Sequence, residues 1–190
     1  MVALSKAATA FLKRKSGIGL PRTCQRASLA MVRGAAFAVP ALLLLVAAPA
    51  EAVSNKVRIT SLSDVAFGTV ANLGVDSVRS ENVCVYADTA SSGYNVTAAG
   101  TGPGGAFQLS SGASSMAFEV QWSSSSGQGS GTQLSPNVPL TGQVSTASHQ
   151  TCSTGPATSA SLIILLRSAA LSSAKAGSYN GTLTLVVGPE

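Results

Sequence analysis

The chain has 190 residues, of which only 10% are charged, and its formal net charge is +5. Seven of its twelve lysines and arginines lie before residue 52, so the rest of the chain keeps five cations and no excess of positive charge. Because no basic surface is left there to neutralise phosphates, nucleic-acid binding is disfavoured.

Residues 35–50 have the features of an export signal. They read AAFAVPALLLLVAAPA, a run shorter than the ~20 residues that span a bilayer, and the small-x-small pattern Ala50-Glu51-Ala52 follows. We predict cleavage after Ala52, with cleavage after Ala50 as the alternative. Residues 1–52 are therefore assigned to a signal peptide that takes no part in the fold, and no membrane span is expected after its removal.

The basic region ahead of the apolar run is unusually long. A start at Met31 would give a signal of ordinary length, MVRGAAFAVPALLLLVAAPAEA. Residues 1–30 are accordingly interpreted as an over-extended start. A genuine long basic region is the alternative.

The segment after the signal favours strands over helices. Glu, Lys, Gln and Arg are scarce, and small polar residues alternate with Val, Leu, Ile and Tyr. Short strands are expected, in chain order, at residues 57–60, 65–70, 82–87, 94–98, 107–109, 116–122, 139–145, 161–167 and 179–187.

Two of these segments carry further expectations. Residues 161–167, SLIILLR, form a continuous apolar run that predicts a strand buried on both faces, with a short helix as the alternative. Phe118, Val120 and Trp122 are expected to share one face of their strand. Residues 123–131 are rich in Ser and Gly and predict a flexible, exposed loop. Seven to nine such strands predict a single all-β sandwich domain over residues 53–190.

Cys84 and Cys152 are the two cysteines that remain after signal removal. An even pair in an exported chain predicts an intramolecular disulfide, and two free buried thiols are the alternative.

The residues that could carry chemistry are few, so no enzyme, no cofactor and no metal site are expected. His149 is the single histidine, no G-x-S-x-G motif is present, and one histidine with two cysteines is too small a ligand set for zinc. The glycine-rich residues 100–105 lack the Lys-Ser/Thr ending of a phosphate loop. Trp122 and the tyrosines could stack on a sugar if exposed, but core positions fit their alternating strands better.

The ordered series of motifs resembles the spore coat protein U domain family, which is similar to the pilin subunits of archaic chaperone–usher pili. The motifs are Phe67-Gly68-Thr69, Val83-Cys84-Val85-Tyr86, GYNVTA from Gly93, MAFEVQW from Met116, and AGSYNGTLTLVVGPE from Ala176. The resemblance covers about residues 64–190.

This resemblance implies an immunoglobulin-like, pilin-type sandwich that lacks its final strand. A periplasmic chaperone would fill the gap first, and the N-terminal strand of a neighbouring pilin-like subunit would replace it at an usher. The last strand, with Leu183, Leu185 and Val187 on one face, would border the acceptor groove. Such a protein would pass through the periplasm and reach the cell surface or a fimbrium.

The N-terminal residues depart from this family pattern. Polymerising subunits carry an alternating donor segment ahead of the fold, and here only residues 53–63 are available. Val53, Val57 and Ile59 share a face, which fits either a short donor strand or the first strand of the domain itself. In the second case the protein would sit at a fibre tip or would not polymerise.

The leading functional interpretation is a secreted structural or adhesive subunit of a surface fibre or coat, assembled by donor-strand complementation. The alternative is a self-contained secreted β-sandwich that binds a glycan or surface ligand.

Overall fold

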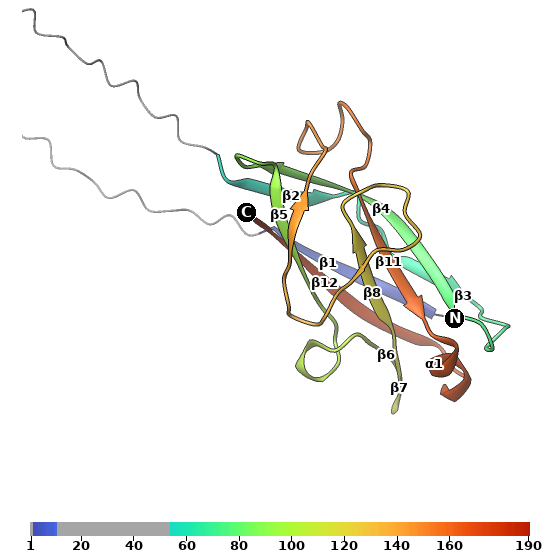
Figure 1. Cartoon of the computed structure of the whole chain (residues 1–190). Helices are drawn as coiled ribbons and strands as arrows, with labels where there is room; N and C mark the ends of the chain where they lie inside the picture. Colours follow the sequence, from blue (N-terminus) through green and yellow to red (C-terminus); the bar gives the residue numbers. More distant parts are fainter. Residues whose placement is uncertain (1, 11–53) are drawn as a thin grey trace, which may run out of the picture. The chain divides into compact units, whose positions relative to one another are not determined.

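The computed structural model describes residues 2–10 and 54–190, and its chain forms a β-sandwich (Figure 1). This confirms the predicted all-β fold class. The elements in chain order are β1 (Val2–Ala10), β2 (Lys56–Thr60), β3 (Val65–Gly68), β4 (Ser77–Asp88), β5 (Gly93–Ala99), the 3-10 turn η1 (Pro103–Gly105), β6 (Gln108–Ser111), β7 (Ser114–Ala117), β8 (Glu119–Ser123), β9 (Thr132–Gln133), β10 (Leu140–Val144), β11 (Ala160–Leu166), α1 (Ser168–Ser173) and β12 (Tyr179–Pro189).

The strands form two sheets. The first has the order β10-β5-β12-β1-β3, with β6 beside β12 and β7 beside β6. The second has the order β2-β4-β11-β8-β9. Among the described strands, β1 and β12 run parallel, whereas the other strand pairs are antiparallel.

The core lies between the sheets and follows from the alternation of apolar residues along the strands. In β8, Phe118 at its entry, Val120 and Trp122 are buried together, as the period-two pattern predicted. The facing sheet contributes the alternating buried residues Tyr94, Val96 and Ala98 of β5 and Leu183, Leu185 and Val187 of β12.

β11 is a strand buried on both faces, and the helix alternative is therefore wrong. Ile163 and Leu165 point away from the sandwich core yet are also buried. The serine-rich loop of residues 123–131 crosses this outer face. The backbone N–H of Gly127 donates to Asn82 Oδ1 at 2.7 Å, and that of Gln128 donates to Ser161 Oγ at 3.0 Å. The loop is largely exposed as expected, but these bonds fasten it to the second sheet.

Several boundaries differ from the sequence expectations. β4 begins at Ser77 rather than residue 82, because its polar first half pairs with the apolar β11. The expected strand at residues 116–122 is divided between β7 and β8. The short helix α1 between β11 and β12, which buries Leu171, was not among the expected elements.

The domain boundaries expected after signal removal stay a prediction, but in the whole chain residues 2–10 are part of a sheet. These residues form β1, which lies between β12 and β3 in the first sheet (Figure 1). The segment reads VALSKAATA, and its alternation of small, apolar and polar residues is compatible with a strand. The apolar run of the predicted signal, its cleavage position at Ala52 and residue Val53 lie outside the described residues.

Candidate functional site

The most unusual feature of the first sheet is the position between β12 and β3, which we call the acceptor slot. Within residues 2–10 and 54–190, β3 pairs with β1 alone, and β12 has β1 on one side and β5 on the other. The strands of residues 54–190 thus leave one place in the sheet unfilled, and β1 occupies it. This agrees with the prediction of a sandwich that lacks one strand.

The walls of the acceptor slot are apolar. Leu183, Leu185 and Val187 of β12 are fully buried, and Val65 and Phe67 of β3 are buried as well. These are the β12 residues that the sequence assigned to the groove. Without an occupant, the N–H and C=O groups along one edge of β12 would lack strand partners, and unpaired edges of this kind favour the addition of a strand.

The direction and register of the occupant are defined. β1 runs parallel to β12 over nine consecutive pairs, from Val2 with Tyr179 to Ala10 with Val187. Its pairing with β3 is antiparallel and short, with an irregularity between residues 2 and 3. By this register, position 6 is paired with Leu183 and position 8 with Leu185.

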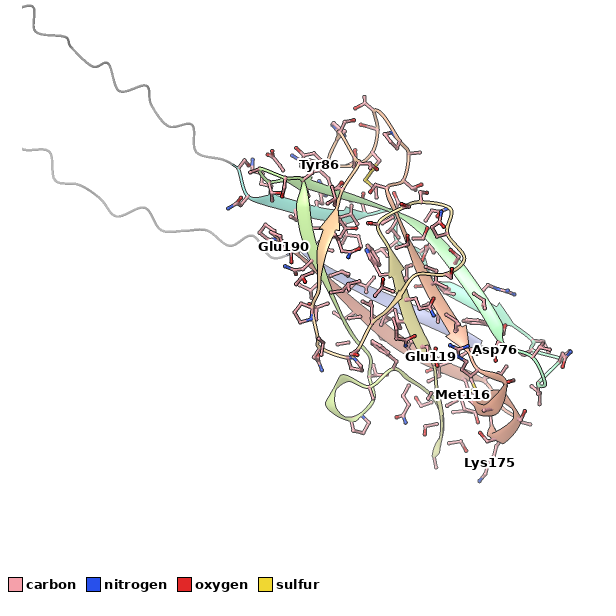
Figure 2. The ribbon with its side chains drawn as sticks, in the orientation of Figure 1. Asp76, Tyr86, Met116, Glu119, Lys175 and Glu190 are labelled. Carbon is pink, nitrogen blue, oxygen red and sulfur yellow. A yellow bond between two sulfur atoms is a disulfide. The ribbon has the colours of Figure 1, made fainter. Side chains whose placement is uncertain are left out.

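A pocket of about 440 Å³ opens at the end of the acceptor slot where β1 begins. Gly68 and Tyr179, both paired with Val2, belong to its lining. Met116 and Lys175 line it from β7 and from the connection after α1, and Figure 2 shows both at this end of the molecule. The pocket therefore extends the acceptor slot beyond the first residue of β1.

The segment that could have been a donor strand belongs to the domain itself. All five residues of β2 pair with β4, from Lys56 with Asp88 to Thr60 with Cys84. Val57 and Ile59 are buried in the core. Of the two interpretations of residues 53–63, the structure has the domain's own first strand.

The predicted disulfide is present. Cys84 in β4 and Cys152 are joined with a Cα–Cα distance of 6.0 Å, which is ordinary for a disulfide. Buried Ser159 reinforces the same junction, because its hydroxyl donates to the carbonyl of Val85 and accepts from the N–H of that residue, both at 2.8 Å. These contacts attach the irregular residues 146–159 to the second sheet.

The structure shows the surroundings of the single histidine that was considered for chemistry. His149 is exposed, and its Nδ1 lies 2.8 Å from Ser153 Oγ and 3.1 Å from Thr151 Oγ1. Among the described residues, no group of three or more His, Cys, Asp and Glu side chains could hold a metal ion. No helix in the same part of the chain is long and apolar enough to cross a membrane.

Three of the four aromatic residues considered for a glycan platform are in the core. Trp122, Tyr94 and Tyr179 are buried, whereas Tyr86 of β4 is partly exposed. Burial raises the pKa of Tyr94 to about 12, opposed in part by the hydrogen bond from Trp122. Of the aromatic side chains considered for the glycan-binding alternative, Tyr86 alone remains partly exposed.

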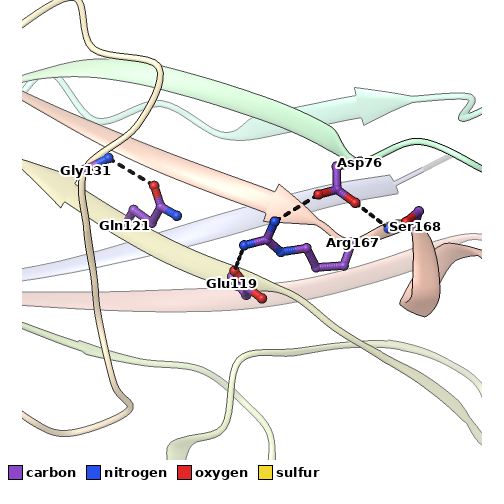
Figure 3. A network of polar contacts seen from close by, with 6 residues as sticks. All are labelled: Asp76, Glu119, Gln121, Gly131, Arg167 and Ser168. Carbon is purple, nitrogen blue, oxygen red and sulfur yellow. Dashed lines mark hydrogen bonds and ion pairs between the residues drawn. The ribbon is translucent and has the colours of Figure 1, made fainter.

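A charged cluster beside the end of β11 was not anticipated from the sequence (Figure 3). Arg167 forms ion pairs with Asp76 at 2.9 Å and with Glu119 at 2.6 Å. The pKa of Asp76 is lowered, first by the backbone N–H of Ser168 and then by Arg167. Because Arg167 joins the residue before β4 to β8, its role is to tie the end of the second sheet together. The only feature in the sequence that could have indicated this cluster is the single cation, Arg167, directly after the apolar residues of β11.

Glu81 is a second acidic residue that the sequence reasoning did not weigh. It lies in β4, and one of its carboxylate oxygens accepts hydrogen bonds from the backbone N–H and the hydroxyl of Ser63. The residue thereby fixes the connection between β2 and β3, which leads into the acceptor slot.

No protein-family model matches the sequence, and no curated protein matches it significantly. One similar solved structure is a chaperone–tip adhesin complex described as vital for synergistic activation of CFA/I fimbriae biogenesis. The two chains are 14% identical with a TM-score of 0.45, over 72% of this chain. The match covers 41% of the other chain. Membership of the spore coat protein U family stays a prediction.

Proposed function

We propose that residues 53–190 form a non-enzymatic, secreted subunit of a surface fibre or coat, completed by a strand from another polypeptide. The observation that carries this proposal is the acceptor slot, where β1 fills the place between β12 and β3. If residues 1–52 are removed on export, β1 leaves with them. The mature domain then needs another strand to cover the apolar walls of the slot and to pair with the backbone groups along the free edge of β12.

The partners follow from this need. A periplasmic chaperone would supply the strand in transit, and a subunit at an usher would supply it in the finished fibre. A strand added to a sheet edge gains affinity from main-chain hydrogen bonds and selectivity from alternate side chains. The proposed destination is therefore the cell surface or a fimbrium.

The proposal is tested by separating the domain from β1. The chain of residues 53–190 is expected to unfold at lower urea concentration than the full chain, with rapid hydrogen exchange along β12. Adding a synthetic peptide of residues 2–10 in excess is expected to raise the unfolding midpoint and to protect the β12 amides, because binding to the folded state stabilises it.

Two variant peptides give a matched control. Position 8 pairs with buried Leu185, whereas position 7 pairs with the partly exposed Thr184. An Ala8→Asp peptide is expected to lose the stabilising effect, because its charge would be paired with the buried Leu185. An Ala7→Asp peptide is expected to keep most of the effect, because its pairing partner is the partly exposed Thr184. The proposal is overturned if residues 53–190 alone are stable and fully protected along β12, or if the peptide does not bind.

A further inference from the structure

The strand β2, the first after the predicted cleavage position, is paired along its whole length with β4 of its own domain. We infer that this domain accepts a strand but gives none, so that the occupant of its acceptor slot comes from a different kind of polypeptide. A second copy of residues 53–190 would not fill the slot, because that domain keeps its β2 paired with its own β4. The inference rests on the proposed function and adds to it that the partner is not another copy of the same domain.

The first support is the pairing of β2 with β4 and the burial of its side chains in the core. Its five residues are in continuous register with β4, and Val57 and Ile59 fill positions in the core between the sheets. Withdrawing β2 to donate it would expose these two side chains and the edge of β4 that carries Cys84, the residue of the disulfide.

The second support is length. β1 needs nine residues to fill the acceptor slot, a span of about 30 Å at the rise of a strand. Cleavage after Ala52 leaves only residues 53–55 ahead of β2, which reach about 10 Å when fully extended. Cleavage after Ala50 would add two residues, which is still too few.

The third support is the location of β2 in the fold. β2 lies at the edge of the second sheet, whereas the acceptor slot is in the first sheet. An exchange of β2 between two copies would therefore rebuild the β2–β4 pair and leave both slots as they were. An acceptor that cannot donate ends a series of strand additions, which places this subunit at one end of an assembly.

The test mixes two versions of residues 53–190 that differ in mass, and native mass spectrometry reads the species formed. With the peptide of residues 2–10, the expected species is one protein with one peptide. Without peptide, the expected result is the absence of mixed oligomers. A two-headed peptide, with two copies of residues 2–10 joined by a flexible linker, is the positive control and is expected to give two proteins on one peptide.

Each outcome bears on the inference. One peptide per protein together with no mixed oligomers supports it. Mixed oligomers that form without peptide, and that the peptide disperses, overturn it while leaving strand acceptance intact. Failure to capture either peptide overturns both the inference and the proposed function. N-terminal determination of the exported protein gives a separate check, because nine or more residues ahead of Lys56 that reach the slot would remove the length argument.

Discussion

Trp122 Nε1 donates a hydrogen bond to the hydroxyl of Tyr94 over 3.1 Å, and this bond joins the two sheets through the middle of the core. Trp122 belongs to β8 and Tyr94 to β5, and their rings meet edge to face with centroids 6.4 Å apart. Polar groups buried at such a place need their partners. The pair therefore orients the sheets as well as filling space.

Trp122→Phe is expected to lower the free energy of unfolding by about 1–3 kcal/mol, because it leaves the buried Tyr94 hydroxyl without its donor. Urea denaturation of the full chain measures the change. Trp122→Phe combined with Tyr94→Phe is the matched control and should recover part of the loss, since no buried hydroxyl is then left unpaired. A single variant as stable as the parent would show that the hydroxyl has another partner.

Stability is expected to fall in alkaline solution because of Tyr94. Its pKa is about 12 in the fold, against about 10 in an unfolded chain. The stabilising contribution is fully present below pH 10 and is lost as the pH rises toward 12, since the unfolded state releases the proton first. Tyr94→Phe should flatten the fall between pH 10 and 12 in unfolding curves. An equally steep fall in this variant would assign the effect to other groups.

Removal of the Cys84–Cys152 disulfide is expected to cost about 4 kcal/mol in the chain-entropy model, because the crosslink spans 68 residues. Unfolding of the full chain with and without reductant measures the cost. A variant with both cysteines replaced by serine should match the reduced protein and be insensitive to reductant. If its stability equals that of the oxidised parent, the crosslink contributes nothing to folding.

Asp76 is expected to make the fold sensitive to acid. Its pKa is lowered by the N–H of Ser168 and by Arg167, so its contribution is present above the ordinary value near 4 and is lost as the pH falls through the lowered pKa. Asp76→Asn should reduce the slope of stability against pH below 4. Because Arg167 and Asp76 are exposed, the effect at pH 7 should be small and should shrink in 1 M salt. A large, salt-independent loss would contradict this description.

The peptide of residues 2–10 is expected to bind more tightly after Lys6→Val. The register pairs position 6 with the fully buried Leu183, where an apolar residue suits the face better than a cation. A gain of about tenfold or more in affinity, or about 1.4 kcal/mol, is expected from titration of residues 53–190. Ser5→Val, at the neighbouring position on the other face, is the control and should change the affinity less. Equal gains at both positions would contradict the register.

Sequence reasoning predicted the elements with strong period-two patterns. The strand at Tyr179 is found where alternation placed it, because burial of one face determines both the element and its register. The alternating burial expected around Trp122 is also present, although that segment is divided between β7 and β8. The apolar run from Ser161 was also correctly predicted to be buried on both faces. Its outer cover, the loop of residues 123–131, was not predicted, because loop packing depends on tertiary contacts such as Gly127 with Asn82.

The candidate site was only partly predictable. The disulfide was predicted from the even number of cysteines and is present. The groove residues of β12 were implied by the family resemblance, and their role stays a prediction. The strand β1 was not predicted, because its residues lie ahead of the predicted signal. The first half of β4 was missed for another reason. Its polar residues have no periodic signal of their own, and they become a strand by pairing with β11. The Arg167 cluster joins residues that are far apart in sequence.

The acceptor slot has a consequence for the kinetics of folding. If the slot is filled by a separate chain, as proposed, the sheet cannot complete its core in a unimolecular step. Folding of residues 53–190 would then be second order, with a rate that rises with the concentration of the donor. Stability then includes a dissociation constant and depends on dilution. Once the strand is in place, its release requires breaking pairs on both edges together. The complex of acceptor domain and donor strand should therefore dissociate far more slowly than its equilibrium affinity alone would suggest.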